Sequence, residues 1–315
     1  MELAGNLALF GSVMTWITPL WVVALGAAGA VGLMYLIGLV LRLFAPRVQA
    51  IARTTAKESL AQPLFYVLLA LGMFGILVFP FIPYNTFGED VKMLKAEGLT
   101  LIKILAIILA VWSASVSISD EIEGRTALTI LSKPLGRRRL IVGKFLGVIT
   151  PVVILFIVLG SLFLASVSYK VVYDARENAS PAPSSAQCQQ EMGQIVPGLA
   201  LSFMEAVALA SISVAISTRL PMLANLVICV SIYVLGHLVP VFVHSTLGEF
   251  AIVGFVGNLL SAVLPVLDHF NMETAISTGQ TVPAVYLVFA GLYCLVYCAV
   301  AMLLALLLFE ERDVA

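Results

Sequence analysis

The sequence predicts an all-α polytopic membrane protein with seven membrane-spanning helices. Of its 315 residues, 61% are hydrophobic and 11% are charged, whereas soluble proteins carry about 25% charged residues. A transmembrane helix needs about 20 mostly apolar residues, and runs of that length recur along almost the whole chain. No stretch remains for a soluble catalytic domain, so we expect a single membrane domain.

The first apolar run, about 16–43, is predicted to be a retained span and not a cleaved signal peptide. A secretory signal has a basic start and an apolar region of about 7 to 15 residues, whereas this chain carries Glu2 and a longer run. Small residues along the run would let another helix approach closely. They are Gly26, Gly29, Ala30 and Gly32.

The basic segment after this run is predicted to lie as an amphipathic helix on the cytoplasmic membrane surface. Its charged residues are Arg42, Arg47, Arg53 and Lys57. Because cytoplasmic loops carry an excess of Lys and Arg, this segment orients the first span with the N-terminus outside.

Six more apolar runs are predicted to cross the membrane. They are about 63–83, 99–119, 140–169, 196–218, 222–244 and 282–309. Pro151 is expected to kink the fourth of the seven spans. The apolar stretch 250–267 is interrupted by Gly and Pro and followed by a loop without Lys or Arg. We therefore predict a re-entrant or outer-surface segment there, before the last span.

The distribution of the 17 Lys and Arg residues supports a topology with the N-terminus outside and the C-terminus in the cytoplasm. The inner set of twelve is Arg42, Arg47, Arg53, Lys57, Arg125, Lys133, Arg137, Arg138, Arg139, Lys144, Arg219 and Arg312; the outer set of five is Lys92, Lys95, Lys103, Lys170 and Arg176. The acidic stretch 85–97 is predicted to be an outer loop. The outer loop 170–194 is rich in Ser, Pro and Gln and is expected to be partly flexible, with Cys188 as the one exterior thiol.

The stretch 117–146 is unusual because many charged residues lie between two predicted spans. Side-chain oxygens around Asp120 and Glu123 are typical of a helix N-terminus. We expect a short cytoplasmic helix of about 120–132, ended by Pro134. A compact helix between two spans is able to transmit a displacement from a partner protein to both spans.

Basic residues at the end of this stretch are placed to contact lipid phosphates or the carboxylates of a partner. They are Arg137, Arg138, Arg139 and Lys144. The alternative is that they only anchor the helix end at the membrane and set the topology.

Several motifs in and near this stretch resemble the intracellular loop of ABC-2 type permeases. They are Glu121-Ile-Glu123, Arg125-Thr126, Leu131-Ser-Lys-Pro134 and Gly143-Lys-Phe-Leu-Gly147. The likeness is to the branch with the nitrous-oxide-reductase maturation and gliding-motility permeases, and it extends from about residue 51 to the C-terminus. Many members have Gly-Thr where this chain has Arg125-Thr126. The family has six core spans, so residues 1–50 would form an extra N-terminal helix with a basic linker and 51–315 the ABC-2 transmembrane domain.

The resemblance implies that a separate ABC ATP-binding subunit docks on the loop 117–146 through a coupling helix. The residues of that contact would be Asp120, Glu121, Glu123, Arg125, Thr126 and Lys133. ATP and Mg would be bound by the partner, and this chain would bind no cofactor. A second permease copy, identical or different, and the lipid bilayer of a bacterial inner membrane are the other expected partners, and no nucleic acid is expected.

The chain is expected to have no ATPase activity of its own. A phosphate-binding loop needs Gly, four residues and then Gly-Lys-Ser/Thr. The one Gly-Lys pair, Gly143-Lys144, is followed by Phe145. Energy would therefore come from the partner, and we expect a transport subunit and not an enzyme.

Glu205 is the one acid well inside a predicted span and is a candidate intramembrane polar site. Because a buried unpaired carboxylate is costly, Glu205 would line a substrate path, bind a proton, or pair with Lys103 or a hydroxyl such as that of Ser202. Serines continue toward the cytoplasm along the same span, so 196–218 is the span expected to face the interior of a dimer.

Two other classes of function stay open. A secondary transporter or channel without an ATPase would need several buried charges along a path, and an integral membrane enzyme would need a cluster of catalytic residues at the membrane face. No metal site is expected, because the spacing of His244, Asp268 and His269 matches no defined ligand pattern. Cys294 and Cys298 share a helical face and are expected to be packing residues.

Overall fold

The chain forms a bundle of long helices. The computed structural model describes residues 14–82, 89–123, 136–178, 180–244, 255–257, 259–260 and 264–310, and all regular secondary structure in these ranges is helical. Six segments of the described chain are long and apolar enough to cross a membrane: Met14–Phe44, Pro63–Phe81, Asp90–Ile118, Arg138–Glu177, Ser185–Ser217 and Ala284–Phe309. A shorter apolar helix covers Met222–Leu238. This arrangement confirms the predicted fold class.

Each of the seven predicted spans contains one long helix. In chain order these are α2 (Leu20–Phe44), α4 (Pro63–Val78), α5 (Asp90–Glu123), α7 (Arg137–Glu177), α9 (Val196–Ser217), α10 (Met222–His244) and α13 (Ala284–Glu310). The connecting elements include α3 (Pro46–Ala61), η1 (Phe79–Phe81), α8 (Ser185–Gly193), η3 (Leu267–Phe270) and α12 (Glu273–Ser277). Pro151 lies inside α7, which continues on both sides of it.

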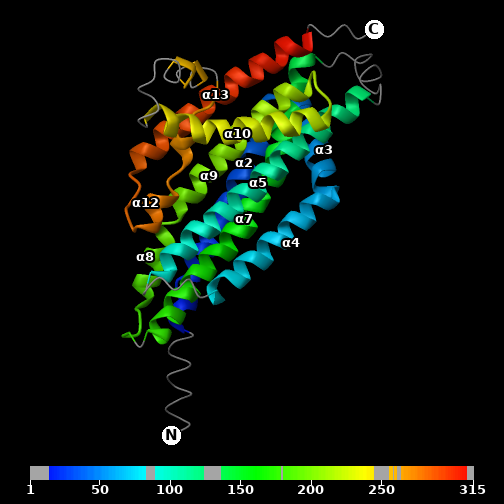
Figure 1. The fold of residues 1–315 in the computed structure, drawn as a ribbon. Coiled ribbons are helices and arrows are strands. Elements are labelled where there is room, and N and C mark those ends of the chain that lie inside the picture. Colours follow the sequence, from blue (N-terminus) through cyan, green and yellow to red (C-terminus); the bar gives the residue numbers. More distant parts are fainter. Residues whose placement is uncertain are drawn as a thin grey trace.

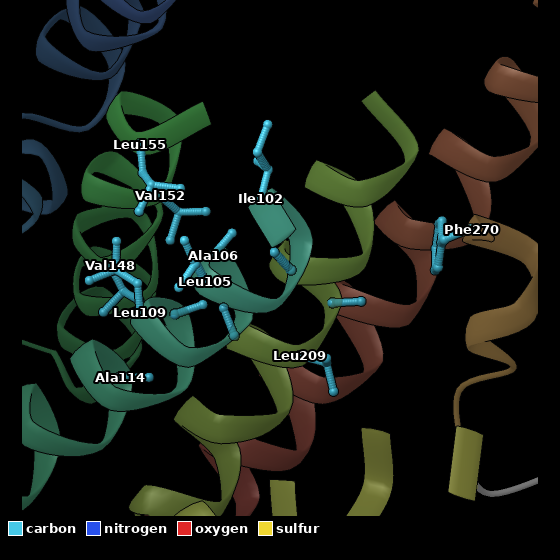
Figure 2. Close-up of a cluster of buried hydrophobic side chains, with 14 of the residues drawn as sticks. Ile102, Leu105, Ala106, Leu109, Ala114, Val148, Val152, Leu155, Leu209 and Phe270 are labelled. Atoms are coloured by element: carbon cyan, nitrogen blue, oxygen red, sulfur yellow. The ribbon is translucent and has the colours of Figure 1, made fainter. Parts of the chain in front are cut away.

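Helices α5, α7 and α9 form the centre of the bundle, with α4 and α13 packed against them (Figure 1). Apolar side chains fill the space between them, among them Leu105, Leu155 and Leu209, each at most 3% exposed (Figure 2). Glycine permits close approach where large side chains meet. A Cβ atom on Gly98 of α5 would lie 2.0 Å from the Phe163 ring of α7.

One end of the bundle collects the elements that the sequence assigns to the cytoplasm. The end of α5, the start of α7, the helix α3 and the end of α13 lie there (Figure 1). Arg219 Nε, in the turn between α9 and α10, donates to the Leu308 carbonyl oxygen of α13 at 2.7 Å. The start of α2 and the helix α8 lie at the opposite end.

The first helix packs lightly against α3 and α7, and no residue of Leu20–Phe44 is buried, although half-buried residues recur along its length. Just before it, the Trp16 ring meets Tyr169 edge to face at 5.7 Å, and the Trp16 carbonyl accepts from Ser168 Oγ at 2.9 Å. Its other end leads into α3, which packs along α7. No other described atom lies within 4 Å of a Cβ placed on Gly26, Gly29 or Gly32. These three glycines are therefore not used for close packing within the described part of the chain.

The two loops that the sequence places on the outer side are more helical than predicted. α5 begins at Asp90, so much of the expected loop 85–97 is helix. α7 continues to Glu177, and α8 follows with a capping box in which Ser184 accepts from the Gln187 backbone N–H. The two segments are held in helical form because they contact each other. Lys95 on α5 contacts Glu191 on α8 and donates to Gln194 at 2.7 Å.

The expectation that Cys188 is an exposed thiol is wrong. Cys188 lies on the buried face of α8 and is 0% exposed. The four cysteines of the chain are all described, and all are buried.

The predicted segment before the last span is described only in part. Of 250–267, the structure describes the short helical pieces at 255–257 and 259–260 and the residues 264–267, and the rest lies outside the described residues. The part that follows, η3 and α12, packs on α5, α9 and α10. Leu267 and Phe270 of η3 are at most 2% exposed, so this segment is seated in the bundle by apolar contacts.

Candidate functional site

The predicted helix start at Asp120 is wrong, because α5 continues through this residue to Glu123. The chain between Gly98 and Glu123 contains neither Gly nor Pro, so nothing in the backbone ends the helix there. The apolar part of α5 ends at Ile118. The acidic residues therefore extend a 34-residue helix beyond its apolar part.

The side chains of all six residues predicted to contact the ATPase lie outside what the structure describes. Only the backbone is described for Asp120, Glu121 and Glu123 in α5 and for Arg137 in α7, while Arg125, Thr126 and Lys133 lie in 124–135, outside the described residues. Arg138 and Arg139 are exposed on the first turn of α7. The short helix expected over 120–132 is thus described only where it overlaps the end of α5, at 120–123.

Lys144 differs from the arginines with which the sequence grouped it. It is 4% exposed, and its Nζ donates to the Ser117 carbonyl oxygen of α5 at 2.9 Å. The same Nζ lies 3.9 Å from Glu58 Oε2 of α3. Lys144 therefore joins three helices at the base of the loop 117–146 and is not presented to lipid phosphates.

The glycines on either side of Lys144 admit α3 against α7. A Cβ on Gly143 would lie 3.2 Å from the Val48 carbonyl oxygen, and one on Gly147 would lie 2.8 Å from the Ala52 carbonyl oxygen. Any side chain at these positions would press on the backbone of α3. The motif Gly143-Lys-Phe-Leu-Gly147 is thus the contact surface that holds α3 on the first turns of α7.

We expect the variant Lys144→Met to lose about 1.5 to 3 kcal/mol of unfolding free energy, the contribution of a hydrogen bond to a charged group. Methionine fills a similar volume but cannot donate to the Ser117 carbonyl. Arg139→Met, on the exposed first turn of α7, is the matched control and should change stability little. Denaturant unfolding of both purified variants measures the difference, and equal stability of the two would contradict this role for Lys144.

Glu205 lies at the centre of a second site, built from charged groups inside the bundle. Its side chain is 0% exposed on α9. Glu205 Oε2 lies 3.9 Å from Lys103 Nζ of α5, so the structure contains the pairing that the sequence offered as one alternative. Glu205 Oε1 lies 3.4 Å from His237 Nε2 of α10.

The segment formed by η3 and α12, which the sequence places on the outer side and which we call the outer segment, adds a second carboxylate to this site. Glu273 of α12 contacts Lys103 through Oε1 and accepts a hydrogen bond from Thr100 Oγ1 of α5 at 2.8 Å. We refer to Lys103, Glu205, His237 and Glu273 as the intramembrane charge cluster. The sequence did not predict the last two members, because α10 and α12 are brought to α9 only by the tertiary fold.

The expectation that α9 faces a dimer interior is wrong for its serines. Ser211, Ser213 and Ser217 are at most 1% exposed within the subunit. Asn225 Nδ2 of α10 donates to Ser213 Oγ and to Ser217 Oγ, both at 2.8 Å. These polar groups join α9 to α10 in the way that hydroxyls and amides join membrane helices.

The other candidate sites give no cluster in the described chain. No group of three or more His, Cys, Asp or Glu among the described residues is arranged to hold a metal ion. Cys294 and Cys298 lie with their sulfur atoms 4.0 Å apart. Each thiol is directed at a backbone carbonyl of α9, that of Met204 for Cys294 and that of Val207 for Cys298.

Comparison with known proteins accounts for the bundle from α3 onward. The family model described as ABC-2 family transporter protein matches residues 49–314. No curated protein matches the chain. The match covers most of the chain and begins after α2, the helix without a buried residue. A multi-pass bundle of apolar helices with this match identifies the chain as a member of the ABC-2 family of transporter membrane proteins.

Proposed function

We propose that the chain is the membrane-spanning permease subunit of an ABC exporter, driven by a separate ATP-binding subunit that docks on the loop 117–146. The observation that carries the proposal is the contact between α5 and α7 at the base of the loop 117–146. These are the two longest helices, with 34 and 41 residues, and the Lys144 to Ser117 hydrogen bond ties them where the loop leaves and re-enters the bundle.

The lengths of α5 and α7 suit a mechanical link. At 1.5 Å per residue they are about 51 and 62 Å long, compared with a bilayer hydrocarbon core of about 30 Å. A displacement of the loop by ATP binding in the partner would be transmitted along both helices into the centre of the bundle. The helix α3, held on α7 by Gly143 and Gly147, would move with them.

The remaining parts of the proposal follow from family membership and charge. ATP and Mg are bound by the partner, and two permease copies, identical or different, form the membrane part. We place the protein in a bacterial inner membrane with its C-terminus in the cytoplasm, and within the branch of the nitrous-oxide-reductase maturation and gliding-motility permeases. The exposed Arg138 and Arg139 support the proposed side of the loop.

The test of coupling uses a candidate ATP-binding partner, co-expressed with this chain and purified as a complex. We expect Glu121→Lys and Arg125→Glu to weaken the complex or to remove the stimulation of ATP hydrolysis by the permease, while the variant permeases stay folded. Lys92→Glu, at the opposite end of α5, is the matched charge change. If both loop variants keep full binding and stimulation, the loop is not the coupling site. Transport by the chain alone, without ATP, would favour a secondary transporter.

Topology has a separate test, because all four cysteines are buried and the natural chain is a low-reactivity background. We expect Gln189→Cys, at an exposed position on α8, to react with an impermeant thiol reagent in intact spheroplasts. Arg139→Cys, exposed on α7, should react only after the membrane is ruptured. The reverse pattern would invert the proposed orientation.

A further inference from the structure

The intramembrane charge cluster carries more negative than positive charge when its histidine is neutral. It contains Glu205, Glu273 and Lys103, with Lys103 shared between the two carboxylates. The cluster lies deep in the bundle: Glu205 is twelve residues from the end of α9 at Ser217, which is about 18 Å along the axis. Net charge at this depth of a bilayer is costly. The cluster therefore needs one more positive charge to be neutral.

The hydrogen-bond geometry shows where the missing charge belongs. His237 Nδ1 lies 3.1 Å from the Tyr233 carbonyl oxygen. A carbonyl only accepts, so we assign the ring hydrogen to Nδ1. Nε2 of the neutral ring then presents a lone pair to Glu205 Oε1 at 3.4 Å. Two acceptors face each other across this contact, and Glu205 Oε1, Glu205 Oε2 and His237 Nε2 have no hydrogen-bond partner among the described atoms.

We propose that the intramembrane charge cluster is a proton-binding site, in which one proton lies between Glu205 Oε1 and His237 Nε2. The proton converts the contact between two acceptors into a hydrogen bond and brings the charge of the cluster to zero. This site is separate from the coupling loop, and the proposal does not depend on the proposed ATPase partner.

A proton fits this site better than a metal cation does. The ammonium group of Lys103 lies 3.9 Å from the same carboxylate and would repel a metal ion placed there. Hard cations such as Na⁺ or Ca²⁺ also need several oxygen ligands, whereas the contact offers one oxygen and one ring nitrogen.

Charged and titratable groups reach the site from several elements packed around it. Lys103 of α5, Glu273 of α12 and Asp268 of η3 are the charged groups whose fields act on Glu205. From α10 come Tyr233 and His237. The titratable groups that α13 presents to α9 are the Cys294 and Cys298 thiols, each directed at a carbonyl.

Occupancy of the site affects the outer segment through Lys103. With the proton bound, Lys103 and Glu273 form a neutral pair that holds α12 on α5. When the proton leaves, the ammonium must compensate both carboxylates, and the contact with Glu273 weakens. Both His237 and Glu273 have side chains 21% exposed, so the proton has access from the side of the outer segment.

Nitrogen NMR of the full-length protein with ¹⁵N-labelled histidine tests the proposal directly. The chain has three histidines, and His237 is assigned by the signal that disappears in His237→Phe. In the natural protein we expect the Nε2 signal of His237 to change from a hydrogen-bonded or protonated nitrogen to a free lone pair as the pH rises. In Glu205→Gln the amide N–H₂ replaces the proton as a permanent donor, so the signal should stay constant over the same range.

Glu191→Gln removes a carboxylate from α8 and should leave the transition of His237 unchanged. The proposal is overturned if the Nε2 signal of the natural protein does not change with pH, or if Glu205→Gln titrates as the natural protein does. It is also overturned if Na⁺ added at constant pH produces the change, because the site would then bind a metal cation.

Discussion

Replacing Lys103 with methionine should cost the protein about 3 to 5 kcal/mol of its unfolding free energy, the usual penalty for breaking a buried ion pair from one side. Lys103 is the only lysine or arginine that the described structure places within 4 Å of Glu205 or Glu273. Without it, Glu205 and Glu273 lose the one ammonium group that the described structure places between them. Unfolding of the purified variant in denaturant, or its loss from the membrane fraction, measures the effect.

Two further variants separate charge from packing. The double variant Lys103→Met with Glu205→Gln removes one charge of each sign and should recover much of the lost stability. Lys92→Met breaks the Lys92–Glu89 pair, whose side chains are 42% and 62% exposed, and should change the unfolding free energy by at most about 1 kcal/mol. If Lys103→Met is as stable as Lys92→Met, the intramembrane charge cluster does not hold the bundle together.

Gly147→Ala should destabilise the protein by about 1 to 3 kcal/mol through overpacking, although alanine is the better helix former. The added Cβ would lie 2.5 Å from Thr55 Cβ and 2.8 Å from the Ala52 carbonyl oxygen. A flexible side chain is able to move away, but the backbone of α3 yields only if the whole helix shifts. We therefore expect α3 to move away from α7.

Gly26→Ala is the matched control for this substitution, since it carries the same gain in helix propensity. No other described atom lies within 4 Å of a Cβ at Gly26, so its stability should be equal to or above that of the natural protein. Denaturant unfolding of both purified variants measures the difference. Equal behaviour of the two alanine variants would contradict the tight α3–α7 contact.

The loss of contact at Gly147 also bears on coupling. α3 is connected to α7 at Gly143 and Gly147 and to Lys144 through Glu58. If the loop 117–146 and the helix α3 move together, Gly147→Ala should weaken the stimulation of ATP hydrolysis more than an equally destabilising substitution elsewhere in the bundle does.

The sequence by itself determined the fold class and the position of nearly every helix. Helices α9 and α10 lie within a residue of the predicted limits, because a lipid core demands long apolar runs with internally satisfied backbones. Composition also determined that the chain is a membrane protein, and the loop motifs pointed to the family that the comparison shows.

The ends of helices in the polar segments were less predictable from the sequence, because local signals for helix ends and loops compete there with contacts between helices. Side-chain oxygens around Asp120 favour a helix start, yet α5 runs through them without a break. Ser, Pro and Gln after Lys170 suggested a flexible loop, yet Lys95 and Glu191 pair across α5 and α8 and keep this region helical.

Only the tertiary structure decided which polar groups meet. Glu205 was recognised in the sequence as an unusual buried acid, and Lys103 as one candidate partner. His237 and Glu273 join them because α10 and α12 fold back onto α9 and α5 over a long stretch of chain. The sequence grouped Lys144 with three arginines as a membrane anchor, but the glycines beside it bring α3 so close that its ammonium group is buried. Helical periodicity specifies the face of one helix, whereas the partner on that face depends on how the helices pack.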